Sequence, residues 1–155
     1  MLNIVLYQPE IAPNTGNIIR LCANSGANLH IIEPLGFEWD TKKLRRAGLD
    51  YHEFTNVTKY SNWQEFYALK QQTNSNAYAF STKATLRYDK INYEKNDFLI
   101  FGPETRGLPQ NIILHENITS LIIPMQQISR SINLANSVSI ALYEAMRQND
   151  FFLTK

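Results

Sequence analysis

The stretch that decides the fold runs from Ile123 to Asn136 and reads Ile-Pro-Met-Gln-Gln-Ile-Ser-Arg-Ser-Ile-Asn-Leu-Ala-Asn. A predicted strand ends in it at Pro124, which has no N–H to donate to a neighbouring strand. A polar cluster then leads into the clearest helix of the chain, Asn133–Gln148, whose apolar residues recur at helical spacing. Asn133 and Asn136 are poor helix formers, so their place in the first turns indicates a role beyond helix formation.

The rest of the chain alternates short β-rich runs with helical segments. Strands are predicted at Asn3–Tyr7, Leu29–Glu33, Ala77–Ser81, Phe98–Phe101 and Ser120–Ile123, and helices at Asn14–Ser25, Thr41–Ala47, Ser61–Gln72 and Asn133–Gln148. This alternation favours an α/β fold with a mostly parallel sheet flanked by helices on both faces. No linker or repeat interrupts it, so residues 1–155 are expected to form a single domain.

Three helix starts carry capping signals. Asn14 is the expected N-cap of the first helix, and Gly26 lies where a glycine C-cap belongs. The run from Ser61 to Gln64 fits a capping box. Ser131 is the expected N-cap of the last helix.

Composition limits the class of protein. Hydrophobic residues make up 44% and charged residues 19% of the chain, which is typical of a folded globular protein, and no apolar run is long enough for a membrane helix. Residues 1–7 read as a first strand, not a signal peptide. The single cysteine, Cys22, allows no internal disulfide and predicts a buried thiol in a cytoplasmic protein. The net charge of +1 does not by itself indicate nucleic-acid binding.

Ligands of parallel sheets bind at the carboxyl ends of the strands, so the loops that follow strands are the candidate site. The loop from Pro9 to Arg20 opens a helix whose free N–H groups suit a phosphate. Gly16 lets a backbone approach, and Arg20 can add a contact to the same phosphate. The alternative is an ordinary capped helix with a solvent-facing arginine.

A second loop, Phe101–Pro109, has two glycines, two prolines and a carboxylate directly after an apolar strand. It matches neither a dinucleotide fingerprint nor a P-loop. Glu104 is either a solvated acid or a group that orients a substrate or a neighbouring segment. The third loop is the stretch from Ile123 to Asn136.

Together the three loops resemble the SPOUT superfamily of RNA methyltransferases. The match comprises Asn14, Gly16, Asn17 and Arg20 in the first loop, Phe101–Leu108 in the second, and Ile123–Met125 with Arg130–Leu134 in the third. The chain looks closest to the minimal subgroup that methylates the ribose 2′-hydroxyl of nucleotide 34, a cytidine or modified uridine, in leucine tRNAs. The resemblance implies a deep C-terminal trefoil knot, a homodimer formed through the first and last helices, and S-adenosylmethionine as methyl donor without a metal.

The resemblance also assigns residues. It implies a cofactor pocket of Phe80, Gly102, Glu104, Gly107, Ile123, Met125 and Ser131. For catalysis it implies Arg20, which would favour the developing alkoxide, helped by Asn14, Ser131 and Asn133. No histidine lies in the three loops, so His30, His52 and His115 are expected to be structural or exposed.

The tRNA is expected to contact a basic patch. Lys42, Arg45 and Arg46 share one face of a predicted helix, which is either a solvated face or a phosphate-binding surface that Arg106 and Arg130 extend. Three alternatives stay open: an rRNA or another tRNA position as substrate, a non-catalytic RNA-binding homologue, and an unrelated nucleotide-binding protein. Neither a membrane nor another protein partner is indicated.

Overall fold

The computed structural model describes residues 1–46 and 56–152. Its centre is a six-stranded sheet in the order β3-β2-β1-β5-β4-β6, in which every pair of neighbours is parallel. The strands are β1 (Asn3–Tyr7), β2 (Asn28–Ile32), β3 (Val57–Tyr60), β4 (Ala77–Phe80), β5 (Phe98–Phe101) and β6 (Thr119–Leu121). The predicted parallel α/β fold is therefore confirmed.

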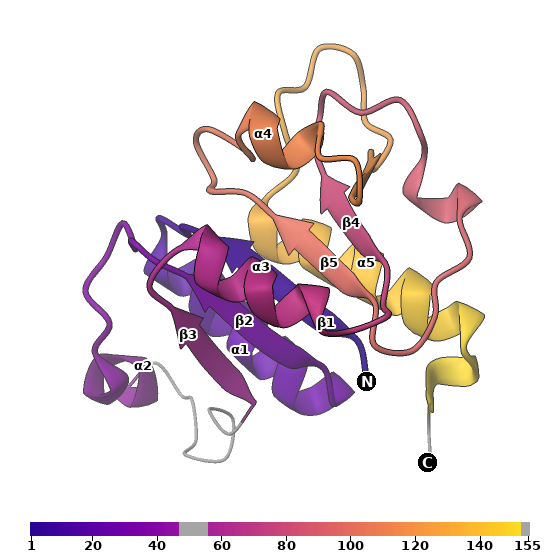
Figure 1. Cartoon of the computed structure of the whole chain (residues 1–155). Helices are drawn as coiled ribbons and strands as arrows, with labels where there is room; N and C mark the ends of the chain where they lie inside the picture. The colour runs from indigo at the N-terminus through magenta and orange to yellow at the C-terminus, as the bar shows by residue number, and fades with distance from the viewer. Residues whose placement is uncertain (47–55, 153–155) are drawn as a thin grey trace.

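Helices cover both faces of the sheet (Figure 1). On one face, α1 (Ala12–Ser25) and α5 (Leu134–Gln148) pack against each other, and their apolar sides bury Ile18, Val138 and Leu142 against the sheet. On the other face, α3 (Trp63–Gln71) and α4 (Gln110–Ile113) bury Phe66 and Ile112. The short helix α2 (Thr41–Arg46) lies beyond the β3 edge, and the 3₁₀ turns η2 (Tyr88–Lys90) and η3 (Asp150–Phe152) complete the elements.

Three of the predicted strands differ in their bounds and β3 was not foreseen; β4 ends at Phe80, one residue earlier than predicted. β2 lies one residue earlier than predicted, and β6 ends at Leu121, although Ile122 still bridges to Arg87. β3 carries an exposed Thr58 and Lys59, so its pattern lacks the apolar density of the inner strands. That is expected of an edge strand, which needs one buried face at most.

The capping predictions were right about Gly26 and wrong at three helix starts. Gly26 ends α1 in the left-handed conformation with φ of 75°. Asn14 lies inside α1, which begins at Ala12 because a proline at its start favours an earlier first turn. The capping box is displaced by one residue: Asn62 accepts from the Glu65 N–H. Asn133, not Ser131, caps α5.

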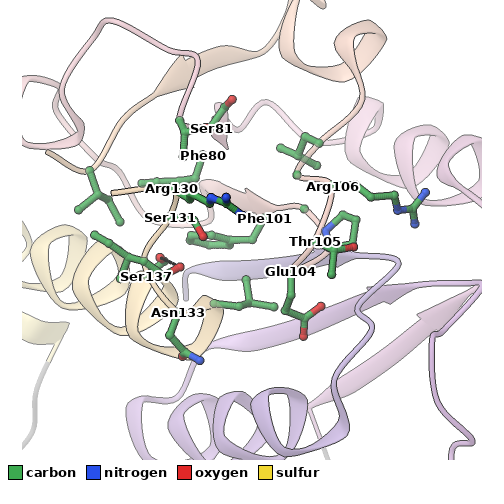
Figure 2. A pocket seen from close by; sticks show the side chains of 18 of the residues that line it. Phe80, Ser81, Phe101, Glu104, Thr105, Arg106, Arg130, Ser131, Asn133 and Ser137 are labelled. Atoms are coloured by element: carbon green, nitrogen blue, oxygen red, sulfur yellow. Dashed lines mark hydrogen bonds between the residues drawn. The ribbon is translucent and has the colours of Figure 1, made fainter. Parts of the chain in front are cut away.

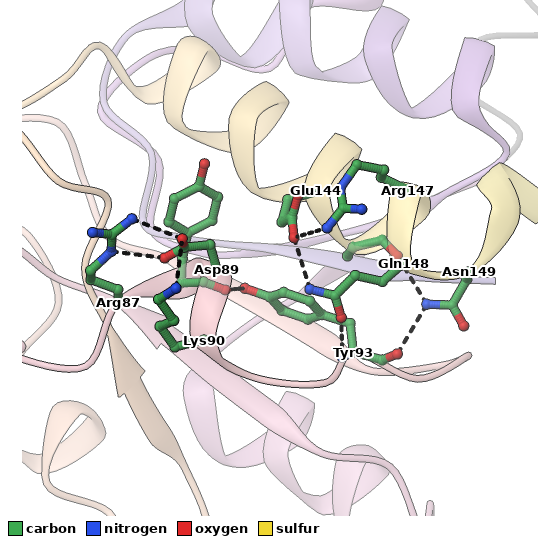
Figure 3. Close-up of polar contacts among 10 residues, drawn as sticks. Arg87, Asp89, Lys90, Tyr93, Glu144, Arg147, Gln148 and Asn149 are labelled. Carbon is green, nitrogen blue, oxygen red and sulfur yellow. Dashed lines mark hydrogen bonds and ion pairs between the residues drawn. The ribbon is translucent and has the colours of Figure 1, made fainter.

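The long connection between β4 and β5 is fastened to α5 by a set of polar contacts (Figure 3). Gln148 accepts from the backbone N–H of Tyr93 at 3.0 Å, and Asn149 donates to the carbonyl of Tyr93 at 3.0 Å. The Tyr93 hydroxyl donates to the carbonyl of Tyr88 at 2.7 Å. These bonds hold the connection against the end of the last helix.

No helix in residues 1–46 or 56–152 combines the length and the apolar character that crossing a membrane requires.

Candidate functional site

A cleft of about 600 Å³ opens at the carboxyl ends of β4, β5 and β6 (Figure 2). The three loops singled out in the sequence meet in it, together with the loop that follows β4. Its walls include Ile11, Asn14, Phe80, the run from Phe101 to Leu108, Ile123, Met125 and the run from Arg130 to Leu134. Segments about 90 and 120 residues apart in sequence thus form one concave surface, as is typical of ligand sites in parallel sheets.

A chain of hydrogen bonds joins the three loops across the cleft. The side-chain amide of Asn14 donates to Glu104 Oε1 at 3.3 Å, and its carbonyl oxygen accepts from the amide of Asn133 at 3.1 Å. The Asn133 oxygen in turn accepts from the Asn136 N–H at 3.2 Å, which starts α5. Asn14 is buried, so its amide orientation is fixed by these partners. These bonds give a structural reason for asparagine at positions 14 and 133.

Glu104 binds the backbone directly before α1, whose N-cap residue, Ile11, has no side-chain acceptor. Its carboxylate accepts from the backbone N–H groups of Glu10 at 2.7 Å and Ile11 at 3.1 Å. A carboxylate at a helix N-terminus satisfies free donors and complements the helix dipole. The side chain lines the cleft, as predicted, but both of its oxygens are engaged with the first loop and Asn14.

Glycines allow the second loop to fold back on itself. A Cβ at Gly102 would lie 2.3 Å from the Leu108 nitrogen and 2.4 Å from the Gly107 carbonyl carbon, so only glycine fits without a backbone shift. Gly107 has φ of 68°, which favours glycine, and nothing lies within 4 Å of its Cβ position. The close approach of the two chain segments in this loop therefore depends on Gly102.

An apolar wall completes the cleft. The rings of Phe80 and Phe101 are stacked with centroids 4.6 Å apart and an interplanar angle of 13°. Polar side chains also line the cleft: Ser131 and Asn133 enter from the third loop and Glu104 from the second (Figure 2). An apolar wall with a few fixed polar groups is the usual form of a small-molecule site.

The structure gathers most of the predicted site residues and separates one. All seven residues predicted for the cofactor line the cleft, as do Asn14 and Asn133. Arg20 is exposed on α1 and is not among the residues that line the cleft of its own chain. An arginine that acts at this cleft must therefore come from elsewhere than the same chain's α1, or α1 must move.

The predicted RNA-binding residues divide into two places. Arg106 and Arg130 line the cleft, and Arg106 donates to Gln8 at 3.2 Å and lies 3.9 Å from Glu10. Lys42 is exposed on α2, whose sequence holds no acidic residue in its first turn. Arg45 and Arg46 belong to the same helix by their backbone. Arg106 and Arg130 thus lie near the end of the sheet formed by β5, β4 and β6, whereas α2 lies beyond β3 at the other end.

Sequence reasoning missed the residues that follow β4. Ser81, Thr82 and Lys83 line the cleft directly after that strand. Their signal was available, because a polar run at the end of an apolar strand in a parallel sheet marks the ligand edge. The link from Thr105 to Glu10, with its hydroxyl donating at 2.8 Å, was not foreseeable because the two residues lie far apart in the chain.

No described histidine belongs to the cleft. His30 is buried between Tyr60 and Asn3, and His115 packs beside Tyr67. His52 lies outside the described residues. Cys22 is buried, as predicted, and burial raises the pKa of its thiol to about 12. Among residues 1–46 and 56–152, no three His, Cys, Asp or Glu side chains gather as a metal site would need.

Comparisons with known proteins agree with this geometry. Over 149 residues the chain is 56% identical to the tRNA (cytidine(34)-2′-O)-methyltransferase of Escherichia coli (strain K12), with 96% of this chain and 94% of that protein covered. The enzyme of the same name from Saccharophagus degradans is 53% identical, with 97% of each chain covered.

Solved structures have the same fold. One, from a study of the 2-OH methylation of C/U34 on tRNA, superposes with a TM-score of 0.89 at 40% identity and covers 97% of each chain. The methyltransferase AviRb from Streptomyces viridochromogenes, in complex with the cofactor AdoMet, superposes with a TM-score of 0.80 at 22% identity, covering 97% of this chain and 58% of that one. The model of the SpoU rRNA methylase family matches residues 1–143. The chain therefore belongs to the SpoU methylase family, within the superfamily that its three loops resemble.

Proposed function

We propose that this protein transfers a methyl group from S-adenosylmethionine to the ribose 2′-hydroxyl of nucleotide 34, a cytidine or modified uridine, in leucine tRNAs. The observation that carries the proposal is the single cleft formed by three loops, with Gly102 at its closest chain approach and the Glu104–Asn14–Asn133 hydrogen bonds across it. The high identity to enzymes named for this reaction supports the choice of substrate.

The cleft fits the methyl donor. The Phe80 and Phe101 rings supply an apolar wall of the kind an adenine needs, and the chain that folds back at Gly102 lines the cleft through Gly102, Gly107 and Leu108. The residues that would hold the donor are those predicted from the sequence: Phe80, Gly102, Glu104, Gly107, Ile123, Met125 and Ser131. When bound, S-adenosylmethionine supplies an electrophilic methyl group, so its transfer needs no metal.

The chain's own task is to position the ribose hydroxyl and help it lose its proton. That hydroxyl is a very weak acid, so stabilising the developing alkoxide lowers the barrier more than positioning alone. Arg20 supplies this charge and holds the neighbouring phosphate. Asn14 and Asn133, fixed by their mutual hydrogen bond, and Ser131 orient the nucleotide at the cleft mouth.

We also propose that the protein works as a homodimer formed through α1 and α5. These helices lie side by side on one face of the sheet, and α5 exposes Ile140 to 37% and Tyr143 to 46%. A two-fold contact over such a surface would remove apolar area from water on both copies. Because Arg20 does not line its own chain's cleft, the partner subunit's Arg20 is the one assigned to each site.

A complementation experiment tests this arrangement. Arg20→Ala and Gly102→Ala chains are each expected to form inactive homodimers. Co-expressed, they form mixed dimers in which one cleft has both an intact Gly102 and the partner subunit's Arg20. About a quarter of the wild-type activity should return if pairing in the two-fold dimer is random. If Arg20 acts within its own chain, the mixture stays inactive.

Three structural expectations complete the proposal. Residues 1–155 form one domain, and the buried Cys22 suits the reducing cytoplasm. The C-terminal segment is expected to be threaded as a deep trefoil knot, and the contacts of Gln148 and Asn149 with Tyr93 in the β4–β5 connection support this expectation.

The substrate is tested by mapping the methylated nucleotide. Leucine tRNAs from a deletion strain should lack the 2′-O-methyl group at position 34, and the purified protein with S-adenosylmethionine should restore it, as read by mass spectrometry of nuclease fragments. A methyl group found instead on rRNA, on another tRNA position or on a base would replace the proposed substrate. Cofactor binding without any transfer to tRNA would indicate a non-catalytic RNA-binding protein.

A further inference from the structure

A second hollow lies at the same edge of the sheet, away from the cleft. It has a volume of about 440 Å³ and opens where β2 and β3 end. Its lining consists of Glu33, Pro34, Leu35, Phe37, Trp39 and Ser61. Neither the methyl donor's cleft nor the catalytic assignment uses any of these residues.

Aromatic rings and fixed charges give this hollow the character of a nucleobase site. Phe37 and Trp39 are both partly exposed. The Lys59 ammonium lies 5.2 Å from the centre of the Trp39 ring and 3.5 Å from a Glu33 oxygen. Aromatic side chains accept any base by its π-face, and a carboxylate accepts hydrogen bonds from the amino groups of bases.

The hollow and the cleft are held in a fixed relation by the loop between them. The Gly36 N–H donates to the Pro9 carbonyl at 2.9 Å, and a Cβ at Gly36 would lie 2.7 Å from Glu10 Cα. Glu10 is bound in turn by the Thr105 hydroxyl at 2.9 Å, on the cleft wall. The backbone around Pro9, Glu10 and Gly36 is therefore tightly packed, and a ligand that reaches from the cleft to the hollow must pass over it.

Positive charge adjoins the hollow. Asp40, next to Trp39, accepts from the N–H groups of Lys42 and Lys43 and so starts α2. The side chains of both lysines are exposed. A phosphate backbone that passes over α2 would meet these cations while the base attached to it faces the aromatic rings, which is the combination single-stranded RNA requires.

We propose that the hollow at Phe37 and Trp39 binds an unpaired nucleobase of the substrate RNA, at a nucleotide other than the one that is methylated. This inference rests on the proposed function for the identity of the RNA. The hollow would fix the RNA loop at a second point beside the cleft. Its chief effect is then on the affinity for RNA and not on the affinity for the methyl donor.

The experiment tests whether one protein side chain and one base of the RNA contribute to the binding affinity through the same contact. The probe is a fluorescein-labelled hairpin with the anticodon stem and loop of a leucine tRNA, and a series in which one loop nucleotide at a time is abasic. Phe37→Leu keeps an apolar side chain but removes the ring, and should weaken binding about tenfold. Trp39→Leu is the second variant, and Leu114→Ala is the control, since Leu114 is 74% exposed outside both hollows.

The decisive result is non-additivity between protein and RNA. One abasic position should weaken binding to the wild-type protein about tenfold and have no further effect on Phe37→Leu, because both changes remove the same contact. Melting temperature and S-adenosylmethionine affinity should stay at wild-type values in Phe37→Leu. Leu114→Ala should bind every hairpin as the wild type does.

The outcomes separate this inference from the proposed function. If the hairpin is methylated at nucleotide 34 but no abasic position couples to Phe37 or Trp39, the base site is overturned and the enzyme assignment stands. If coupling is found but the methyl group is placed elsewhere, the base site stands and the substrate assignment falls. A hairpin that is neither bound nor methylated overturns both.

Discussion

Gly102 is the residue on which the shape of the cleft depends most directly. A methyl group there would collide with backbone atoms of Gly107 and Leu108, which no side-chain rotation can relieve. We expect Gly102→Ala to abolish measurable S-adenosylmethionine binding in calorimetry and to cost about 1–3 kcal/mol of unfolding free energy, as overpacking does. Gly26→Ala is the matched control, because its Cβ meets only Met1 Sδ at 3.8 Å, the left-handed backbone alone is strained, and Gly26 does not line the cleft. Equal cofactor affinity in the two variants would contradict this account.

His30 makes stability depend on pH. Its Nε2 lies 3.2 Å from Asn3 Oδ1, which can only accept, so the neutral ring donates there and accepts from the Tyr60 hydroxyl at 2.9 Å. Burial lowers the pKa of His30 from 6.5 to about 4. The unfolded chain therefore binds a proton that the folded chain excludes, and stability is lost as pH falls from about 6.5 toward 4.

The expected loss for His30 is about 2 kcal/mol between pH 7.5 and pH 5, measured by urea unfolding. His30→Gln has no titrating ring and serves as the reference for the carboxylates that also titrate in this range. The difference between the two proteins, not the absolute slope, isolates the histidine. Identical pH slopes in both would show that His30 does not carry the effect.

At the scale of elements, sequence patterns predicted the helices and strands whose formation depends on residues close together in the chain. The inner strands and α5 carry dense apolar periodicity, and both were found. The start of α1 was misjudged partly because the backbone before it is bonded by Glu104, a residue 93 positions away from Ile11, and no local pattern reports such a partner. The cleft residues were identified through their loops, whereas the position of Arg20 outside its own chain's cleft depends on packing that spacing does not reveal.

The proposed role of the basic helix α2 in tRNA binding is tested by the salt dependence of the affinity. If Lys42, Arg45 and Arg46 contact phosphates, replacing each by alanine should reduce the slope of log affinity for tRNA against log salt by roughly 0.7–0.9. Lys95→Ala is the control, because its ammonium lies 5.5 Å from the Phe152 ring at the C-terminal end of the fold. Fluorescence anisotropy across a salt series measures the slope. An unchanged slope in the triple variant would assign α2 to a solvated face.

The path of the whole chain is the feature that local patterns could not predict. Strand and helix periodicities are compatible with an ordinary open sheet, and knots are so rare that such reasoning rejects them. The structure supplies the relevant contacts: Ile122 N–H donates to Leu86, Tyr88 N–H donates to Ile122, and Gln148 accepts from Tyr93. The chain after β6 thus touches the β4–β5 connection before α5, through Ile122, and again at the end of α5, through Gln148 and Asn149.

Stretching single molecules tests the proposed knot. A chain pulled from its two ends should unfold to a contour shorter than full extension by about 3.5 Å for each residue that stays in a tightened knot. Pulling between residue 1 and a Thr119→Cys handle, in a Cys22→Ala background, leaves out α5 and should give the full contour of that segment. Thr119 is exposed, so the handle does not disturb the core. Full extension from both pairs of handles would show an unthreaded chain, since an open sheet has no crossing to tighten.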